Sequence, residues 1–344
     1  MGLRPQFRLL ANGSDITGTI SERLASLRFT DEAGLESDVL DVLLEDADPA
    51  SPIAMPPTGA ELELFLGYDG AAQRMGLFVV DEIELAGWPG TMRITARAAP
   101  FEKSKGGKQR LQSQKTRSWP KDTKLSAMVQ KIAKEHGMQG AVSQSLASVT
   151  LPHMDQTDES DLHFLTRIAR KYDAVVKPAG GKLVVAKRGE SKSTSGQQLP
   201  AVTLAPGDVS TWRVTLAKRE NSGSVVAAWH DRQTAKRKLV TVGKGEPVTR
   251  LRMQYSTEGQ AVAAAKAELE KRARGERKLN LTLPGRTDLV AEGPLTLAGF
   301  REGVDGAWLI TSVDHQLDNG GYVCSVQAEV PKGNAQSNVE KSEE

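Results

Sequence analysis

Two segments of the chain match each other without a gap, and this repeat constrains the fold more than any other feature. Residues 76–98 align with residues 306–328 at a constant offset of 230 positions. Both segments alternate apolar and polar side chains around a turn, with Gly90 and Gly320 at equivalent places. Alternation with a period of two, interrupted by a glycine turn, is typical of a β-hairpin. We therefore predict two equivalent hairpins in two similar β domains.

Short alternating segments also fill the rest of both ends of the chain. Residues 5–100 contain several such runs, each bounded by Gly, Pro or Asp, and residues 201–333 return to the same pattern. Short strands that follow one another about every ten residues are typical of a small barrel or sandwich. The expected fold class is therefore mainly β, with two similar β-barrel domains.

Residues 119–188 predict a small α+β unit between the two β domains. Apolar side chains recur at helical spacing over residues 125–132, with Thr123 as the expected N-cap and Gly137 as the expected stop. A second helix is expected over residues 158–172, with short strands before and after it.

These patterns divide the chain into five parts. We expect a first β-barrel domain over residues 1–102, an α+β insert over 103–190, a linker over 191–200, a second β domain over 201–333 and a disordered tail over 334–344. The linker and the tail are assigned from their polar composition. One helix is expected inside the second β domain, over about residues 257–274, where Thr257 and Gln260 form a capping-box pattern.

Charge is balanced in total but uneven along the chain. Lys and Arg number 45 against 43 Asp and Glu, a net charge of +2, which does not support a bulk nucleic-acid coat or a polybasic membrane binder. Residues 1–100 hold seven Arg, no Lys and sixteen acidic residues, a net charge of −9 that leaves +11 for the remainder. A compositional boundary therefore lies near residue 102.

Several classes of protein are excluded by what the sequence lacks. The single cysteine, Cys324, allows neither an intrachain disulfide framework nor a cysteine-built zinc site, and it favours folding in a reducing cytoplasm. No apolar run reaches the length of a membrane span, and the N-terminus lacks the features of a signal peptide. No common nucleophile, phosphate-binding or zinc-protease motif occurs.

One segment, residues 153–163, concentrates acidic and histidine side chains, which are His153, Asp155, Asp158, Glu159, Asp161 and His163. Such groups could ligate a metal, but their spacing matches no metal motif. Acidic side chains at the start of a helix instead complement its dipole and cap its free N–H groups. We therefore expect a helix start here, and we predict no catalytic, cofactor-binding or metal-ligating residue in the chain.

Three long motifs resemble one known family. The segments KTRSWPKDTKLSAMVQKIAKEHG, LPHMDQTDESDLHFLTRIARKYDAVVKPAGGKLV and LPGRTDLVAEGPLTLAGF, the last followed by WLITSVDH, occur in this order. Together they resemble the late control protein D family of contractile phage tails, and the resemblance covers about residues 5–330. This family is the baseplate hub, a virion structural component assembled in the host cytoplasm.

The resemblance implies a non-enzymatic homotrimer without a cofactor. Its paired tube-like β domains would form a pseudo-sixfold ring that joins the hexameric tail tube, or its initiator protein, to the trimeric tail spike. Contacts with a tape measure protein and a baseplate wedge are also compatible with it, and DNA would only pass through the channel. The chain lacks a spike repeat after about residue 330, so the spike is expected to be a separate protein. The region after Trp229, which in the family can hold a long lysine-rich insertion, is short here.

The sequence supports two further expectations, an alternative function and a placement of the acidic residues. DTKLSAMVQKIAKEHG is also similar to the peptidoglycan-binding LysM module, which leaves an alternative in which residues 115–188 bind or help degrade the cell wall. In a ring, part of the acidic excess of the first domain should face the channel or the neighbouring basic domain, where it would repel DNA or guide assembly. The residues concerned are Glu36, Asp38, Asp41, Glu45, Glu61, Glu63, Asp69, Glu82 and Glu84.

Overall fold

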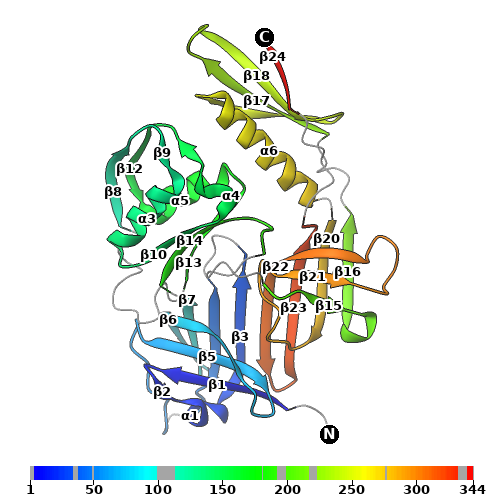
Figure 1. Ribbon diagram of the computed structural model, residues 1–344. Coiled ribbons are helices and arrows are strands. Elements are labelled where there is room, and N and C mark those ends of the chain that lie inside the picture. Colours follow the sequence, from blue (N-terminus) through cyan, green and yellow to red (C-terminus); the bar gives the residue numbers. More distant parts are fainter. Residues whose placement is uncertain are drawn as a thin grey trace.

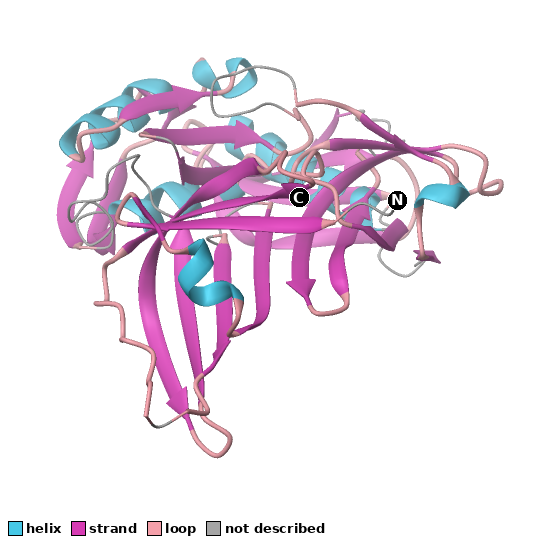
Figure 2. Ribbon diagram, turned by 90° about the horizontal axis from the view of Figure 1, so that it is seen from below, coloured by secondary structure: helices cyan, strands magenta, loops and turns pink. Residues whose placement is uncertain are grey.

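A large β-sheet forms the body of the protein, and two smaller units are attached to it (Figure 1). The computed structural model describes residues 4–33, 38–48, 50–98, 113–179, 181–191, 199–216, 223–275, 277–331 and 339–343. Within these residues strands predominate and helices are few (Figure 2), as the alternating sequence predicts. None of the described helices is long and apolar enough to cross a membrane.

The first half of the large sheet is built from the N-terminal segment. Its elements are β1 (Pro5–Ala11), β2 (Ser14–Asp15), α1 (Thr17–Ser21), β3 (Leu24–Glu32), β4 (Val39–Glu45), β5 (Glu61–Tyr68), β6 (Gln73–Ala86) and β7 (Thr91–Ala98). Apart from the short β2, these strands lie in the order β1-β5-β6-β7-β4-β3.

The second half repeats this arrangement. Its elements are β15 (Val202–Leu204), the short 3-10 helix η1 (Pro206–Asp208), β16 (Thr211–Leu216), β20 (Arg277–Pro284), β21 (Pro294–Leu297), β22 (Gly306–Asp318) and β23 (Gly321–Glu329). The strands lie in the order β15-β21-β22-β23-β20-β16, which is the order of the first half strand for strand. The outermost pair differs, because β1 runs antiparallel to β5 whereas β15 runs parallel to β21. The predicted duplication of the β unit is therefore present in the structure.

The two halves do not close into separate barrels, contrary to the expectation from sequence. Strand β3, at the end of the first half, pairs antiparallel with β22 of the second half, so that both belong to one thirteen-stranded sheet. Their apolar side chains share a single core, which includes Leu27, Phe29, Val313 and Leu317. The alternating pattern identified these segments as strands, but it contains no information on which strand pairs with an edge.

The repeated hairpins differ from the predicted alignment by two residues. Each first strand carries a β-bulge at the equivalent place, directly after Val80 in β6 and after Ile310 in β22. Val80 lies opposite Ala96 and Ile310 lies opposite Ala328, so the offset is 230 in the first strand and 232 in the second. After the bulge the β22–β23 ladder continues for seven residue pairs and the β6–β7 ladder for five, whereas the second turn is two residues shorter, so the second hairpin is two residues longer overall. Because this shift is even, side chains aligned by the repeat still point to the same face of the sheet in both hairpins.

The α+β unit follows the first half of the sheet and has its own apolar core. Its elements are β8 (Gln114–Trp119), β9 (Thr123–Lys124), α3 (Leu125–Glu135), β10 (Gln139–Val142), α4 (Gln144–Ala147), β11 (Thr150–Leu151), β12 (Met154–Ser160), α5 (Asp161–Arg170), β13 (Ala174–Ala179) and β14 (Lys182–Lys187). Both predicted helices exist, and Gly137 ends the first with a positive φ of 71°. Thr123 is not its N-cap, because its hydroxyl donates instead to the carbonyl of Pro120.

A third unit is inserted between β16 and β20. It comprises β17 (Ser224–Asp231), β18 (Lys236–Gly243), β19 (Val248–Tyr255), α6 (Glu258–Gly275) and β24 (Val339–Glu343). The helix predicted at 257–274 packs on this four-stranded sheet and shares a separate core with it, rather than covering the large sheet. The sequence pattern did not separate this unit from the second β domain, because both are built largely of short strands.

The predicted disordered tail is wrong for residues 339–343. These residues form β24, which pairs antiparallel with the edge of β18. Strand addition at an edge is made by backbone hydrogen bonds, so a polar segment can join a sheet as readily as an apolar one. The expected linker at 191–200 lies mostly outside the described residues, as does the basic stretch that begins at Lys103.

Candidate interaction surface

The joint between β3 and β22 is held on its polar face by a charged contact. Arg28 donates from Nε to Oδ1 of Asp314 at 2.7 Å, and the hydroxyl of Thr30 donates to the same oxygen at 3.1 Å. The hydrogen bond to Asp314 raises the pKa of Arg28. Charge-assisted hydrogen bonds are stronger than neutral ones and require a defined register. This contact therefore ties together two strands that are almost 290 residues apart in sequence.

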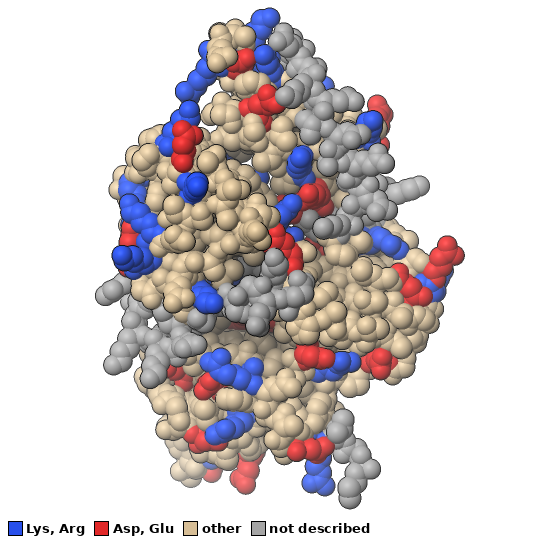
Figure 3. Space-filling view, in the orientation of Figure 1, with Lys and Arg blue, Asp and Glu red and all other residues tan. Residues whose placement is uncertain are grey.

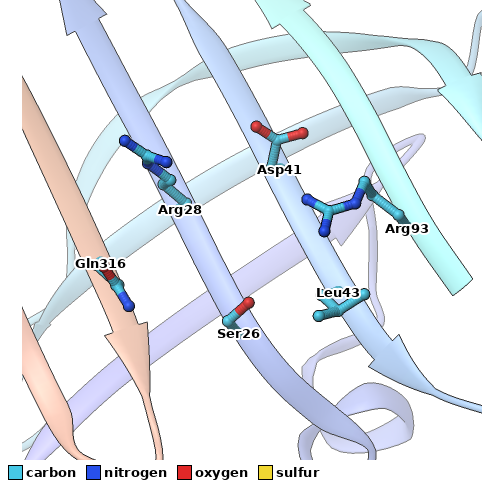
Figure 4. A pocket seen from close by; sticks show the side chains of 6 residues that line it. All are labelled: Ser26, Arg28, Asp41, Leu43, Arg93 and Gln316. Carbon is cyan, nitrogen blue, oxygen red and sulfur yellow. The ribbon is translucent and has the colours of Figure 1, made fainter. Parts of the chain in front are cut away.

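A shallow hollow of about 200 Å³ lies on the same face of the sheet (Figure 4). It is lined by Ser26, Arg28, Asp41, Leu43, Arg93 and Gln316. Asp41 accepts a hydrogen bond from the hydroxyl of Thr95 at 2.7 Å. None of the lining residues is a histidine, a cysteine or a second carboxylate, so the hollow lacks an acid–base pair or an activated nucleophile. Its chemistry suits polar contacts with another surface.

The buried side of the joint is built around His315. Its ring stacks on Phe29 with centroids 5.4 Å apart, and Nδ1 lies 2.8 Å from the hydroxyl of Tyr322 and 3.2 Å from Sγ of Cys324. Burial lowers the pKa of His315 to about 4 and raises the pKa of Cys324 to about 11. Both groups are therefore neutral near pH 7, and the thiol is not activated.

A second ion pair joins the α+β unit to the first half of the sheet. Nζ of Lys177, on β13, lies 2.8 Å from Oδ1 of Asp38 and 3.2 Å from Oδ1 of Asp31. Burial raises the pKa of Asp38 to about 6, in spite of the opposing effect of Lys177 and together with repulsion by Asp31. The basic insert thus contacts the acidic domain within one chain.

The predicted acidic helix start is confirmed for Asp161, which lies in the first turn of α5 with Ser160 as the N-cap. It is wrong for Asp155, Asp158 and Glu159, which lie on strand β12 before the helix. The side chain of Asp161 is fully buried and accepts hydrogen bonds from Arg117, Lys115, Gln156 and His136. Burial acts to raise the pKa of Asp161, but these bonds outweigh it and lower that pKa. Such a set of contacts is a structural network rather than a metal site, and the described residues hold no group of three or more potential metal ligands.

Acidic side chains of the first half do not form an unbroken negative surface. On the polar face, Arg97 pairs with Asp81 at 2.8 Å and Arg93 lies 3.9 Å from Glu84. On the face shown in Figure 3, acidic and basic residues are interspersed. The prediction that the acidic excess faces a channel concerns an assembly and stays a prediction, and Glu36 lies outside the described residues.

Among the described residues, two of the unpaired strand edges of the large sheet carry exposed apolar side chains. One is the side of residues 82–86 of β6 that faces away from β7, and the other is the side of β16 that faces away from β20. Exposed apolar side chains gather at both edges. Leu85 and Trp88 are 55% and 81% exposed, and Trp212 and Leu216 are 41% and 67% exposed. Unpaired, apolar strand edges are typical of surfaces that pair with another chain.

Comparisons with known proteins agree on one family. The family model described as "Phage tail baseplate hub (GPD)" matches residues 59–321. The probable baseplate hub proteins of Escherichia phages 186 and P2 are 34% and 33% identical to this chain, and each alignment covers 99% of this chain and 97% of the phage protein. The solved structure of a 43 kDa tail protein from prophage MuSo2 of Shewanella oneidensis has the same fold, with a TM-score of 0.70 and 14% identity over 95% of this chain and 98% of that one.

Proposed function

Because the chain belongs to the phage tail baseplate hub family and is thus a component of the tail baseplate of a contractile phage tail, we propose that three copies form a ring that joins the tail tube to the tail spike. The observation that supports a trimer is the duplicated strand order within one continuous sheet. Three chains with two equivalent units each supply six similar positions around an axis. A ring of this kind fits a hexameric tube on one side and a trimeric spike on the other.

The proposed role is mechanical and does not involve catalysis. The hollow on the polar face offers no acid–base pair, and the one described thiol is buried and kept protonated. The ring would hold an open channel through which DNA passes. The proposed partners are the tail spike, the tail tube or its initiator, the tape measure protein and the baseplate wedge.

Native mass spectrometry of the full chain, alone and with the spike protein, tests this proposal. We expect a mass three times that of the chain, and one spike trimer bound per ring. A chain that stays monomeric in both samples, or a tail reconstruction with six copies in the ring, would contradict the proposal.

The cell-wall alternative for residues 115–188 receives no support from the comparisons. The family match includes this whole segment, and both phage relatives align over nearly the full chain. Incubation of the purified chain with peptidoglycan sacculi, followed by sedimentation, should leave it in the supernatant.

A further inference from the structure

The joint inside one chain provides a template for the contact between chains. Strand β3 ends the first half of the sheet, and β16 holds the same place in the second half. Strand β3 pairs with the part of β22 that follows its bulge. The equivalent part of β6 is residues 82–86, whose free side has no partner among the described residues. The free edges of β16 and β6 are thus equivalent to the two edges that pair at the joint between β3 and β22.

The strand registers determine which residues would meet. In the first half, Phe29 lies opposite Leu40, which in turn lies opposite Ala96. In the second half, Val214 lies opposite Leu279, which in turn lies opposite Ala328, the equivalent of Ala96. Val214 is therefore the counterpart of Phe29. At the joint Phe29 faces His315, whose counterpart at the offset of 230 is Leu85.

We propose that β16 of one copy pairs antiparallel with residues 82–86 of β6 in the next copy, with Val214 opposite Leu85 and Leu216 opposite Ile83. This inference rests on the proposed trimer and adds the residues that close it. The direction and register repeat those of the β3–β22 pair. Three such contacts, alternating with three internal joints, close the ring.

Apolar burial favours this register. Leu85 and Leu216 are 55% and 67% exposed in the single chain, whereas His315 and Val313, at the positions equivalent to Leu85 and Ile83, are fully buried by the internal joint. Ile83 and Val214 already pack against the margin of the shared core. Pairing in this register would extend that core across the boundary between chains and remove the exposed leucines from water.

Charge complementarity favours the same register. The internal joint is fixed by Arg28 and Asp314, which directly precede Phe29 and His315. In the proposed pair, Arg213 directly precedes Val214, and Glu84 directly precedes Leu85. Arg213 is exposed and has no ion-pair partner among the described residues, and Glu84 has only a long contact to Arg93 at 3.9 Å. An Arg213–Glu84 pair between copies would repeat the Arg28–Asp314 pair with the same signs.

Disulfide trapping tests the register directly. Residues directly opposite each other in antiparallel strands lie within the Cα separation that a disulfide allows, and residues two positions away do not. The full chain carrying Val214→Cys and Leu85→Cys should therefore form a covalent trimer under mild oxidation, seen on a non-reducing gel. The matched control, Val214→Cys with Ile83→Cys, should remain uncrosslinked. If native mass shows a trimer but only the control forms a crosslink, the register is wrong and the proposed trimer stands. If both variants remain monomeric by native mass, the register and the proposed trimer are both wrong.

Charge reversal gives an independent readout. Glu84→Arg alone and Arg213→Glu alone should each lower the trimer fraction at least tenfold at low salt, and the double variant should restore it. Lys134→Glu, on the exposed surface of α3, is the control and should leave the fraction unchanged. Failure of the double variant to recover, while both single variants stay folded by circular dichroism, overturns the proposed ion pair.

Discussion

Lys177 offers a sharp test of how the α+β unit is attached to the sheet. Its ammonium lies between Asp31 and Asp38, and the side chains are 28%, 14% and 17% exposed. Lys177→Met keeps the side chain up to the position of Cε and leaves two close carboxylates without their cation. Removing one partner of a fully buried ion pair costs about 3–5 kcal/mol. Because Lys177 keeps some contact with water, we expect a loss of about 2–3 kcal/mol in the free energy of unfolding at pH 8.

The loss should depend on pH in a defined direction. The pKa of Asp38 is about 6 in the folded chain, above its ordinary 3.8, so the folded chain takes up this proton at a higher pH than the unfolded chain does. The carboxyl therefore contributes more to the stability of the fold as the pH falls through 6. Without Lys177 that pKa rises further, because burial and Asp31 then act unopposed. For each unit by which the pKa of Asp38 rises in Lys177→Met, the loss in the free energy of unfolding becomes about 1.4 kcal/mol smaller at pH 5 than at pH 8.

Urea unfolding followed by tryptophan fluorescence measures this effect, since Trp119 is buried in the core of the α+β unit. Lys187→Met is the matched control, because Lys187 pairs with Glu270 on the surface and such pairs contribute about 0–1 kcal/mol. Equal losses for Lys177→Met at pH 5 and pH 8, or a loss no larger than that of the control, would refute the reasoning.

Three more predictions concern the joint, a turn and the insert. The pKa of His315 is about 4 in the folded chain, below its ordinary 6.5, so the chain should lose up to about 3 kcal/mol of stability as the pH falls from 6.5 to 4. In His315→Leu the urea midpoint should depend less on pH over this range. Gly90→Ala should destabilise by about 1–3 kcal/mol in thermal melting, because a Cβ there would lie 2.1 Å from the carbonyl oxygen of Asp46. Gly18→Ala, where the Cβ meets open space, should be nearly neutral, and equal effects of the two would contradict the steric argument. Asp161→Ala should cost about 3 kcal/mol, since it leaves Lys115 and Arg117 with Glu135 as their one remaining ion-pair partner among the described residues and removes the buried acceptor of Gln156. A loss below about 1 kcal/mol would show that the network contributes little.

The sequence by itself determined the β character of both ends of the chain, the places of α3, α5 and α6, and the duplication of a β unit. Period-two alternation identified β6 and β22 as strands, and helical spacing located α3 and α5, because both periods follow from local backbone geometry. The candidate surface was not predicted in this way. The apolar residues at its edges, Leu85 and Leu216, have the same local pattern as the buried residues at the internal joint.

Only the tertiary structure decided how the strands are joined. The pairing of β3 with β22, the two-residue shift after the turn and the addition of β24 to β18 all depend on backbone hydrogen bonds, which any sequence can make. The contact of Lys177 with Asp31 and Asp38 likewise joins residues about 140 positions apart, which no local pattern connects. Side-chain periodicity records which face of a strand meets the core, whereas the identity of the neighbouring strand is fixed only when the whole chain packs.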